Sequence, residues 1–69
     1  MNEITLEING ETRTIPAVSS VAELLEVLGV SGSRVAVEVN RKIVRRGEWE
    51  KTPISHLDRV EIVQFVGGG

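Results

Sequence analysis

The sequence predicts a small α+β domain in which a mixed sheet of four to five strands packs on one main helix. Two hydrophobic periodicities indicate this fold class. Apolar and polar residues alternate near both ends of the chain, as in half-buried strands, whereas a stretch between them has helical spacing. The chain has 69 residues and no cysteine, so its core must form from aliphatic side chains without disulfides.

The chain begins with a predicted β-hairpin. Residues 3–8 alternate strictly, with every second side chain apolar, which predicts a half-buried strand. Asn9-Gly10 follows, and this pair favours a type I′ turn because both of its central positions need a positive φ. Residues 11–15 then form the returning strand.

One helix follows the hairpin. Ser20 and Glu23 fit a capping box, in which the serine hydroxyl accepts a hydrogen bond from the backbone N–H of the glutamate. Apolar residues with helical spacing then form one stripe: Val21, Leu24, Leu25 and Leu28. Gly29 stands where a left-handed C-terminal cap is expected. A helix of two turns needs to pack against a sheet to be stable.

The second half of the chain predicts two strands and a long connection before the final strand. Residues 34–39 are largely apolar, which predicts a central strand. Asn40-Arg41 turns the chain, and residues 42–44 form a brief edge strand. Residues 45–56 are a loose connection with one helical turn around Trp49.

Residues 59–66 form the last predicted strand, and three glycines end the sequence. This order of elements is that of the β-grasp, or ubiquitin-like, fold, with the helix covering one face of a mixed sheet. We therefore expect a β-grasp domain over residues 1–66 and a flexible glycine tail over residues 67–69.

Composition favours a carrier or binding protein over an enzyme. One histidine and no cysteine leave no catalytic constellation and no metal site, so we expect neither catalytic residues nor metal ligands. The net charge of −2 gives no electrostatic footprint for nucleic acid or an anionic membrane. No apolar run is long enough to span a bilayer and no export signal is visible, so we expect a cytoplasmic protein.

The chemically distinctive segment is Gly67-Gly68-Gly69, directly after the last strand. A carboxylate becomes an electrophile once ATP adenylates it, and a sulfur nucleophile can then displace AMP and leave a thiocarboxylate. Glycines lack Cβ and can follow a narrow channel into the active site of another protein. We expect Gly69 to react, with Gly67 and Gly68 entering that site. The alternative is a frayed end or a cloning remnant.

The end of the last strand predicts a docking surface. If alternate residues face the helix, Val63 and Phe65 share the opposite face. Exposed apolar side chains next to the tail often mark a partner-binding surface, which we predict to include Val63, Phe65 and Val66. The alternative is a twist or bulge near Gln64 that turns Phe65 into the core.

Two segments resemble the ThiS family of thiamine sulfur-carrier proteins. Residues 40–49 match its pattern of Asn, a hydrophobic pair, Arg and Trp, and residues 58–69 match its final strand and glycine tail. The resemblance covers nearly the whole chain. One departure is Leu57-Asp58, where many relatives have Gly-Asp, so the geometry of this turn is a point to test.

The resemblance implies a reaction cycle. A ThiF-type adenylyltransferase, using ATP and magnesium, activates Gly69, and a cysteine desulfurase pathway supplies sulfur. The thiocarboxylate then delivers sulfur to thiazole synthase, while this chain itself binds no cofactor. Three alternatives remain. They are a sulfur carrier like the molybdopterin-synthase small subunit, a ubiquitin-like modifier that forms an isopeptide with a lysine, and a non-catalytic β-grasp interaction domain.

Several other polar or aromatic residues have structural interpretations. Trp49 is expected to cover an edge of the core, although a partner anchor is the alternative. Arg45 and Arg46 are expected to be solvated and to protect a sheet edge, although pairing with acidic groups of the adenylating enzyme is the alternative. His56 is interpreted as a loop residue without a catalytic role, and Asp58 as a turn cap.

Overall fold

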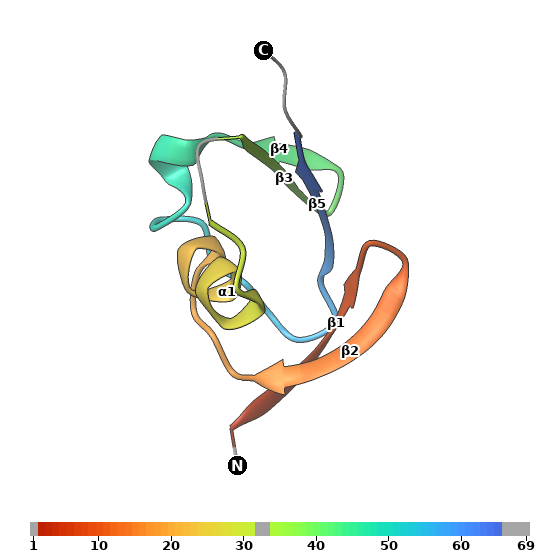
Figure 1. Ribbon diagram of the computed structural model, residues 1–69. Helices are drawn as coiled ribbons and strands as arrows, with labels where there is room; N and C mark the ends of the chain where they lie inside the picture. Colours follow the sequence, from red (N-terminus) through yellow and green to blue (C-terminus); the bar gives the residue numbers. More distant parts are fainter. Residues whose placement is uncertain (1, 32–33, 66–69) are drawn as a thin grey trace.

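A computed structural model describes residues 2–31 and 34–65 and contains a five-stranded mixed sheet with one α-helix on one of its faces (Figure 1). The elements are β1 (Glu3–Ile8), β2 (Glu11–Pro16), α1 (Val21–Leu28), β3 (Val35–Val39), β4 (Lys42–Val44), the 3₁₀ turn η1 (Arg46–Glu48) and β5 (Arg59–Gln64). The strand order is β2-β1-β5-β3-β4. β1 and β5 pair in parallel, whereas β1–β2, β3–β4 and β3–β5 are antiparallel. The predicted α+β β-grasp fold is confirmed.

The first hairpin forms as its turn sequence predicts. Ile8 pairs with Glu11, which leaves Asn9 and Gly10 as a two-residue turn. Their φ angles are 51° and 83°, the positive values that a type I′ turn requires. The bounds of β1 match the prediction, and β2 extends one residue further, to Pro16.

The helix begins and ends at the predicted caps. The Ser20 hydroxyl accepts from the backbone N–H of Glu23 at 3.2 Å. The Glu23 carboxylate accepts in turn from the backbone N–H of Ser19 at 2.7 Å and from its hydroxyl at 3.0 Å. The reciprocal half of the capping box therefore falls one residue before the N-cap. Gly29 caps the other end with a φ of 73°.

The core lies between α1 and the sheet. Its buried members come from β1, β2, α1, β3, β5 and the long connection: Leu6, Ile8, Ile15, Val21, Leu24, Leu25, Val37, Val39, Ile54 and Val60. The connection contributes Ile54 because residues 52–54 run beside the start of α1, where the Ile54 N–H donates to the Ser19 carbonyl. No described helix is long and apolar enough to cross a membrane.

Trp49 covers an edge of this core, as the sequence predicts. Its side chain is half-buried, and its indole N–H donates to the Val44 carbonyl at 3.1 Å. The one helical turn expected in the connection is η1, which ends at Glu48 with Trp49 as its C-cap. Arg46 is exposed, as expected, and its guanidinium carbon also lies 5.3 Å from the centre of the tryptophan ring.

The strand predicted as central at residues 34–39 is an interior strand of the sheet, as expected, because β3 is flanked by β5 and β4. β5 occupies the middle of the sheet, between β1 and β3, and β3 lies next to the edge strand β4. β5 also ends at Gln64, earlier than the predicted residue 66. The backbone N–H of Phe65 nevertheless donates to the Arg34 carbonyl at 2.8 Å, so the contact with the β3 side continues to this residue.

The turn before β5 places Leu57 in the left-handed region. The Asp58 N–H donates to the Ser55 carbonyl at 3.0 Å and closes the turn, in which Leu57 has a φ of 74°. The Asp58 carboxylate accepts from the Ser55 N–H at 2.8 Å, which confirms Asp58 as a turn cap. Thr5 fastens the turn to β1. Its carbonyl accepts from the Leu57 N–H, and its N–H donates to Nδ1 of His56 at 3.0 Å.

Candidate functional site

The face of the sheet that α1 does not cover presents an apolar patch, which we call the open-face patch. It consists of Ala36, Ile43, Val63 and Phe65. Ala36 lies directly opposite Val63 in the β3–β5 pair, and Ile43 lies on the neighbouring β4. Ile43, Val63 and Phe65 are 75%, 51% and 58% exposed. Large apolar side chains gathered on one exposed face indicate a binding surface.

The predicted docking residues divide into two groups. Val63 and Phe65 are exposed as expected, and the alternative in which a twist buries Phe65 is wrong. Val66 lies outside the described residues, as do Gly67, Gly68 and Gly69. The roles predicted for these four residues, and the domain boundary between residues 66 and 67, therefore stay predictions.

Sequence reasoning missed Ile43 and Ala36 as members of the patch. Both belong to strands that were predicted, but the side on which they point depends on strand register. Ile43 is opposite Glu38, and Glu38 is opposite Glu61, so all three share the open face. Because β4 has three residues, its pattern of polar and apolar side chains is too short to predict its register against β3.

Two carboxylates stand next to the open-face patch. Glu38 and Glu61 occupy directly opposite positions on β3 and β5. Neither carboxylate forms an ion pair with a described residue. The ion pair on this face joins Arg59 to Glu7. Like charges in opposite positions of a sheet repel and destabilise the pairing. This repulsion would be relieved by a partner that presents a basic side chain.

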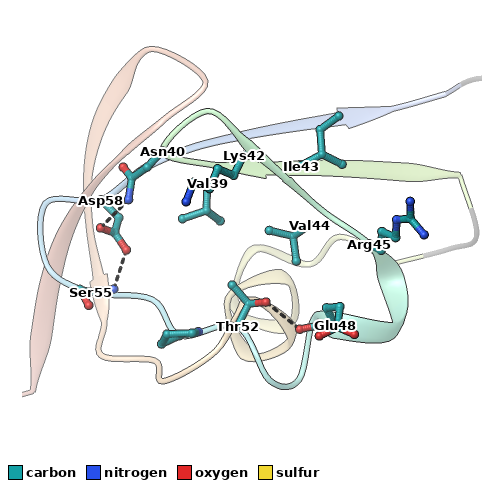
Figure 2. A pocket seen from close by; sticks show the side chains of 11 residues that line it. Val39, Asn40, Lys42, Ile43, Val44, Arg45, Glu48, Thr52, Ser55 and Asp58 are labelled. Atoms are coloured by element: carbon teal, nitrogen blue, oxygen red, sulfur yellow. Dashed lines mark hydrogen bonds between the residues drawn. The ribbon is translucent and has the colours of Figure 1, made fainter.

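A hollow of about 530 Å³ lies beside β4, between the β3–β4 hairpin and the long connection (Figure 2). Several of its polar groups form hydrogen bonds that hold the fold. The Asp58 carboxylate accepts from Nδ2 of Asn40 at 3.1 Å and from the Ser55 N–H at 2.8 Å. The Thr52 hydroxyl donates to the Glu48 carbonyl at 2.8 Å. The side chains of Asn40, Thr52 and Asp58 in this lining are therefore engaged in structural hydrogen bonds.

The described side chains offer no group of three histidine, aspartate or glutamate residues placed to hold a metal ion. One carboxyl group is clearly perturbed. Hydrogen bonds from the Ser19 backbone and then the Ser19 hydroxyl lower the pKa of Glu23 from its ordinary value of 4.5. This glutamate caps a helix, so its shift has a structural cause.

The open-face patch is firmly joined to the strand that precedes this tail. Val63 pairs with Ala36, Gln64 pairs with Val35, and the N–H of Phe65 is bound to the Arg34 carbonyl. Phe65 is thus held at the edge of the patch, four residues before Gly69 in the sequence. A fully extended segment of four residues reaches at most about 14 Å. A partner that engages Gly69 must therefore bring its active site within that distance of Phe65.

Comparisons with known proteins agree with this architecture. A sequence model of the ThiS family matches residues 6–69. The crystal structure of the thiamine biosynthesis protein ThiS from Geobacter metallireducens superposes with a TM-score of 0.80 at 33% identity, covering 96% of this chain and 100% of that one. An uncharacterized protein of Porphyra purpurea, ycf40, is 35% identical over 66 residues, which are 96% of this chain and 93% of that protein.

Two relatives are much longer proteins. A thiazole synthase of Paramagnetospirillum magneticum is 44% identical over 64 residues, and one of Magnetococcus marinus is 36% identical over 64 residues. Each match includes 93% of this chain, but the chain spans only 20% of the length of either synthase. With a family match over residues 6–69 and a solved ThiS protein of the same fold, the chain belongs to the ThiS family.

Proposed function

We propose that this chain is the sulfur carrier for thiazole formation in thiamine biosynthesis, with the sulfur held as a thiocarboxylate on Gly69. The observation that carries this proposal is membership of the ThiS family over residues 6–69, a range that includes the glycine tail. The open-face patch supports it, because an exposed apolar surface lies within reach of the tail.

The proposed chemistry begins at the terminal carboxylate. One of its oxygens attacks the α-phosphorus of ATP, a P–O bond forms, and pyrophosphate leaves. The resulting acyl adenylate is attacked at its carbonyl carbon by a hydrosulfide equivalent. A C–S bond forms, the C–O bond to AMP breaks, and the product is the thiocarboxylate. A ThiF-type adenylyltransferase supplies the ATP and magnesium site, and a cysteine desulfurase pathway supplies the sulfur.

We infer that thiazole synthase is the acceptor of this sulfur. In two relatives, a segment similar to 93% of this chain belongs to a protein called thiazole synthase. A carrier domain and a synthase domain in one polypeptide are held at a high effective concentration, which suits transfer between them. For a carrier that is a separate chain, binding through the open-face patch would likewise raise the local concentration of Gly69 at the synthase.

One tail cannot occupy two active sites at once. The adenylyltransferase and the synthase must each place their active site within about 14 Å of Phe65, because the four residues after it reach no further. The two enzymes therefore bind the carrier in turn. The side chains of Val63 and Phe65 are the proposed contacts for both, together with Val66 next to them in the sequence.

Intact-protein mass spectrometry tests the carrier chemistry. The chain is incubated with ATP, magnesium, cysteine, a cysteine desulfurase and a ThiF-type enzyme. We expect the mass to rise by the difference between sulfur and oxygen, with fragmentation placing the change at Gly69. A chain lacking Gly69 is the matched control and should not change.

Each other outcome has a distinct meaning. An unchanged mass with a demonstrably active enzyme set would contradict the proposal. An isopeptide to a lysine of another protein would instead indicate a ubiquitin-like modifier. If the thiocarboxylate forms but does not support thiazole synthesis with an active thiazole synthase, the chain is a sulfur carrier for another acceptor, such as a molybdopterin synthase.

A further inference from the structure

Two residues of the described chain adopt a backbone conformation that does not suit their side chains. Arg41 has a φ of 72° and Leu57 a φ of 74°. The left-handed region costs most residues about 1–2 kcal/mol, whereas glycine adopts it freely and asparagine tolerates it. The other described non-glycine residues with a positive φ are Asn9 and Asn40.

The chain itself shows what would avoid this strain at Arg41. Both of its hairpins have two-residue turns that begin with asparagine at a φ of 51°. The first hairpin continues with Gly10, which has a φ of 83°. The second has Arg41 in the equivalent position. A glycine at that position would remove the strain, so the arginine side chain requires another explanation.

Arg41 and Leu57 line the same hollow, which we call the arginine–leucine hollow. It has a volume of about 360 Å³, and its other lining residues are Glu7, Asn40 and Arg59. The Leu57 side chain is 71% exposed, and Arg41 is exposed as well. Burial in the core of the free protein therefore does not explain why either side chain is present.

The hollow has a surplus of positive charge. Arg59 forms an ion pair with Glu7, with 3.5 Å between Nε and Oε2. Arg41 has no carboxylate within ion-pair distance among the described residues. The lining of the hollow contains two arginines and one glutamate, so one of its positive charges has no compensating negative charge. The whole chain, by contrast, has a net charge of −2. An acidic group would complement Arg41, and an apolar group would cover Leu57.

The hollow and the open-face patch lie on the same face of the sheet. Arg59 alternates along β5 in phase with Val63, whereas the buried Val60 points to the opposite side. The seven residues from Arg59 to Phe65 span about 20 Å at the rise of a β-strand. One partner can therefore contact both the hollow and the open-face patch.

We propose that the arginine–leucine hollow is a second contact for thiazole synthase, distant from the tail, which receives an acidic side chain at Arg41 and an apolar side chain at Leu57. This inference rests on the proposed function, since thiazole synthase is its acceptor. The open-face patch brings the tail to the synthase, and the hollow fixes the orientation of the carrier on it. Strain in the free carrier is retained because the two side chains are used in the complex.

Two glycine substitutions test the proposal without weakening the fold. Leu57→Gly and Arg41→Gly each relieve a strained φ while removing the side chain in question. We expect each to weaken binding to purified thiazole synthase about tenfold in calorimetric titrations, as for loss of an interface anchor. Their thermal unfolding temperatures should not fall. Val27→Ala is the control, because Val27 is 44% exposed on α1, which covers the other face.

The outcomes separate this inference from the proposed function. If both glycine variants bind as tightly as the unmodified chain while Val63→Asp loses binding, the hollow is not a contact and the carrier function stands. If the unmodified chain does not bind an active thiazole synthase, the proposed acceptor and this inference are both wrong. A reduced salt dependence of binding in Arg41→Gly would support the acidic partner group.

Discussion

The side chain of Asn9 forms two hydrogen bonds with the backbone of Ile62. Its Nδ2 donates to the Ile62 carbonyl at 3.1 Å, and its Oδ1 accepts from the Ile62 N–H at 2.7 Å. The backbone pairing of β1 with β5 is limited to two residue pairs, of which the last joins Ile8 to Val60. The amide of Asn9 therefore extends this parallel pairing beyond the end of β1 and holds the central strand in register.

Replacement of Asn9 by alanine should lower the free energy of unfolding by about 1–3 kcal/mol, because two backbone groups of β5 lose their partner. Alanine also tolerates the φ of 51° less well. Asn9→Gly is the matched control, since it removes the amide but accepts the positive φ, and it should cost about 1 kcal/mol less than alanine. Urea denaturation measures both values. Equal stability of the alanine variant and the unmodified chain would contradict the role of the amide.

The capping glutamate should make stability depend on pH. Hydrogen bonds from Ser19 lower the pKa of Glu23 in the folded state below its ordinary value of 4.5. A carboxyl group with a lowered pKa contributes stability above its unfolded pKa, and this contribution is lost as the pH falls through the folded pKa. Glu23→Gln should therefore reduce the melting temperature at about pH 7 but much less at about pH 3. Glu26→Gln on the same helix is the control. A constant difference between the two pH values would contradict this explanation.

The facing carboxylates of Glu38 and Glu61 should limit the stability of the free protein. Glu61→Lys replaces a repulsive cross-strand pair with an attractive one, and we expect a gain of about 0.5–1.5 kcal/mol in the free energy of unfolding. Glu61→Gln removes only the repulsion and should gain less. Both gains should shrink at high salt, which screens exposed charges. Denaturation at two salt concentrations measures these effects, and destabilisation by lysine would show that the facing carboxylates do not repel appreciably.

The sequence predicts the elements that depend on local interactions. The Asn9-Gly10 turn and the Ser20–Glu23 cap involve groups within a few residues of one another, and both form as expected. Their stabilising contacts need no other part of the fold. This is why the bounds of β1 and the start of α1 could be predicted closely.

Features that depend on distant contacts were predicted less well. The apolar stretch at residues 34–39 predicted an interior strand, but it could not predict that β5 pairs with both β3 and β1. The positive φ of Leu57 has no local signal, since contacts with Thr5 fasten that turn to β1. The membership of Ile43 in the open-face patch likewise depends on the register of β4 against β3.

The open-face patch should be required for sulfur loading independently of stability. Val63 is 51% exposed, so Val63→Asp places a charge at the centre of the patch without creating a cavity in the core. We expect the rate of thiocarboxylate formation at low carrier concentration to fall at least tenfold, because burying an unpaired carboxylate at an interface is costly. The loss should appear mainly as a higher KM, since the tail itself is unchanged.

Val27→Asp is the matched control for Val63→Asp, because it introduces the same charge on α1, on the other side of the molecule. Mass spectrometry of the thiocarboxylate at several carrier concentrations gives KM and kcat for both variants. A variant that is folded by circular dichroism and has an unchanged KM would show that the adenylyltransferase does not bind this face. A fall in kcat alone would instead indicate that Val63 positions the tail after docking and contributes little to affinity.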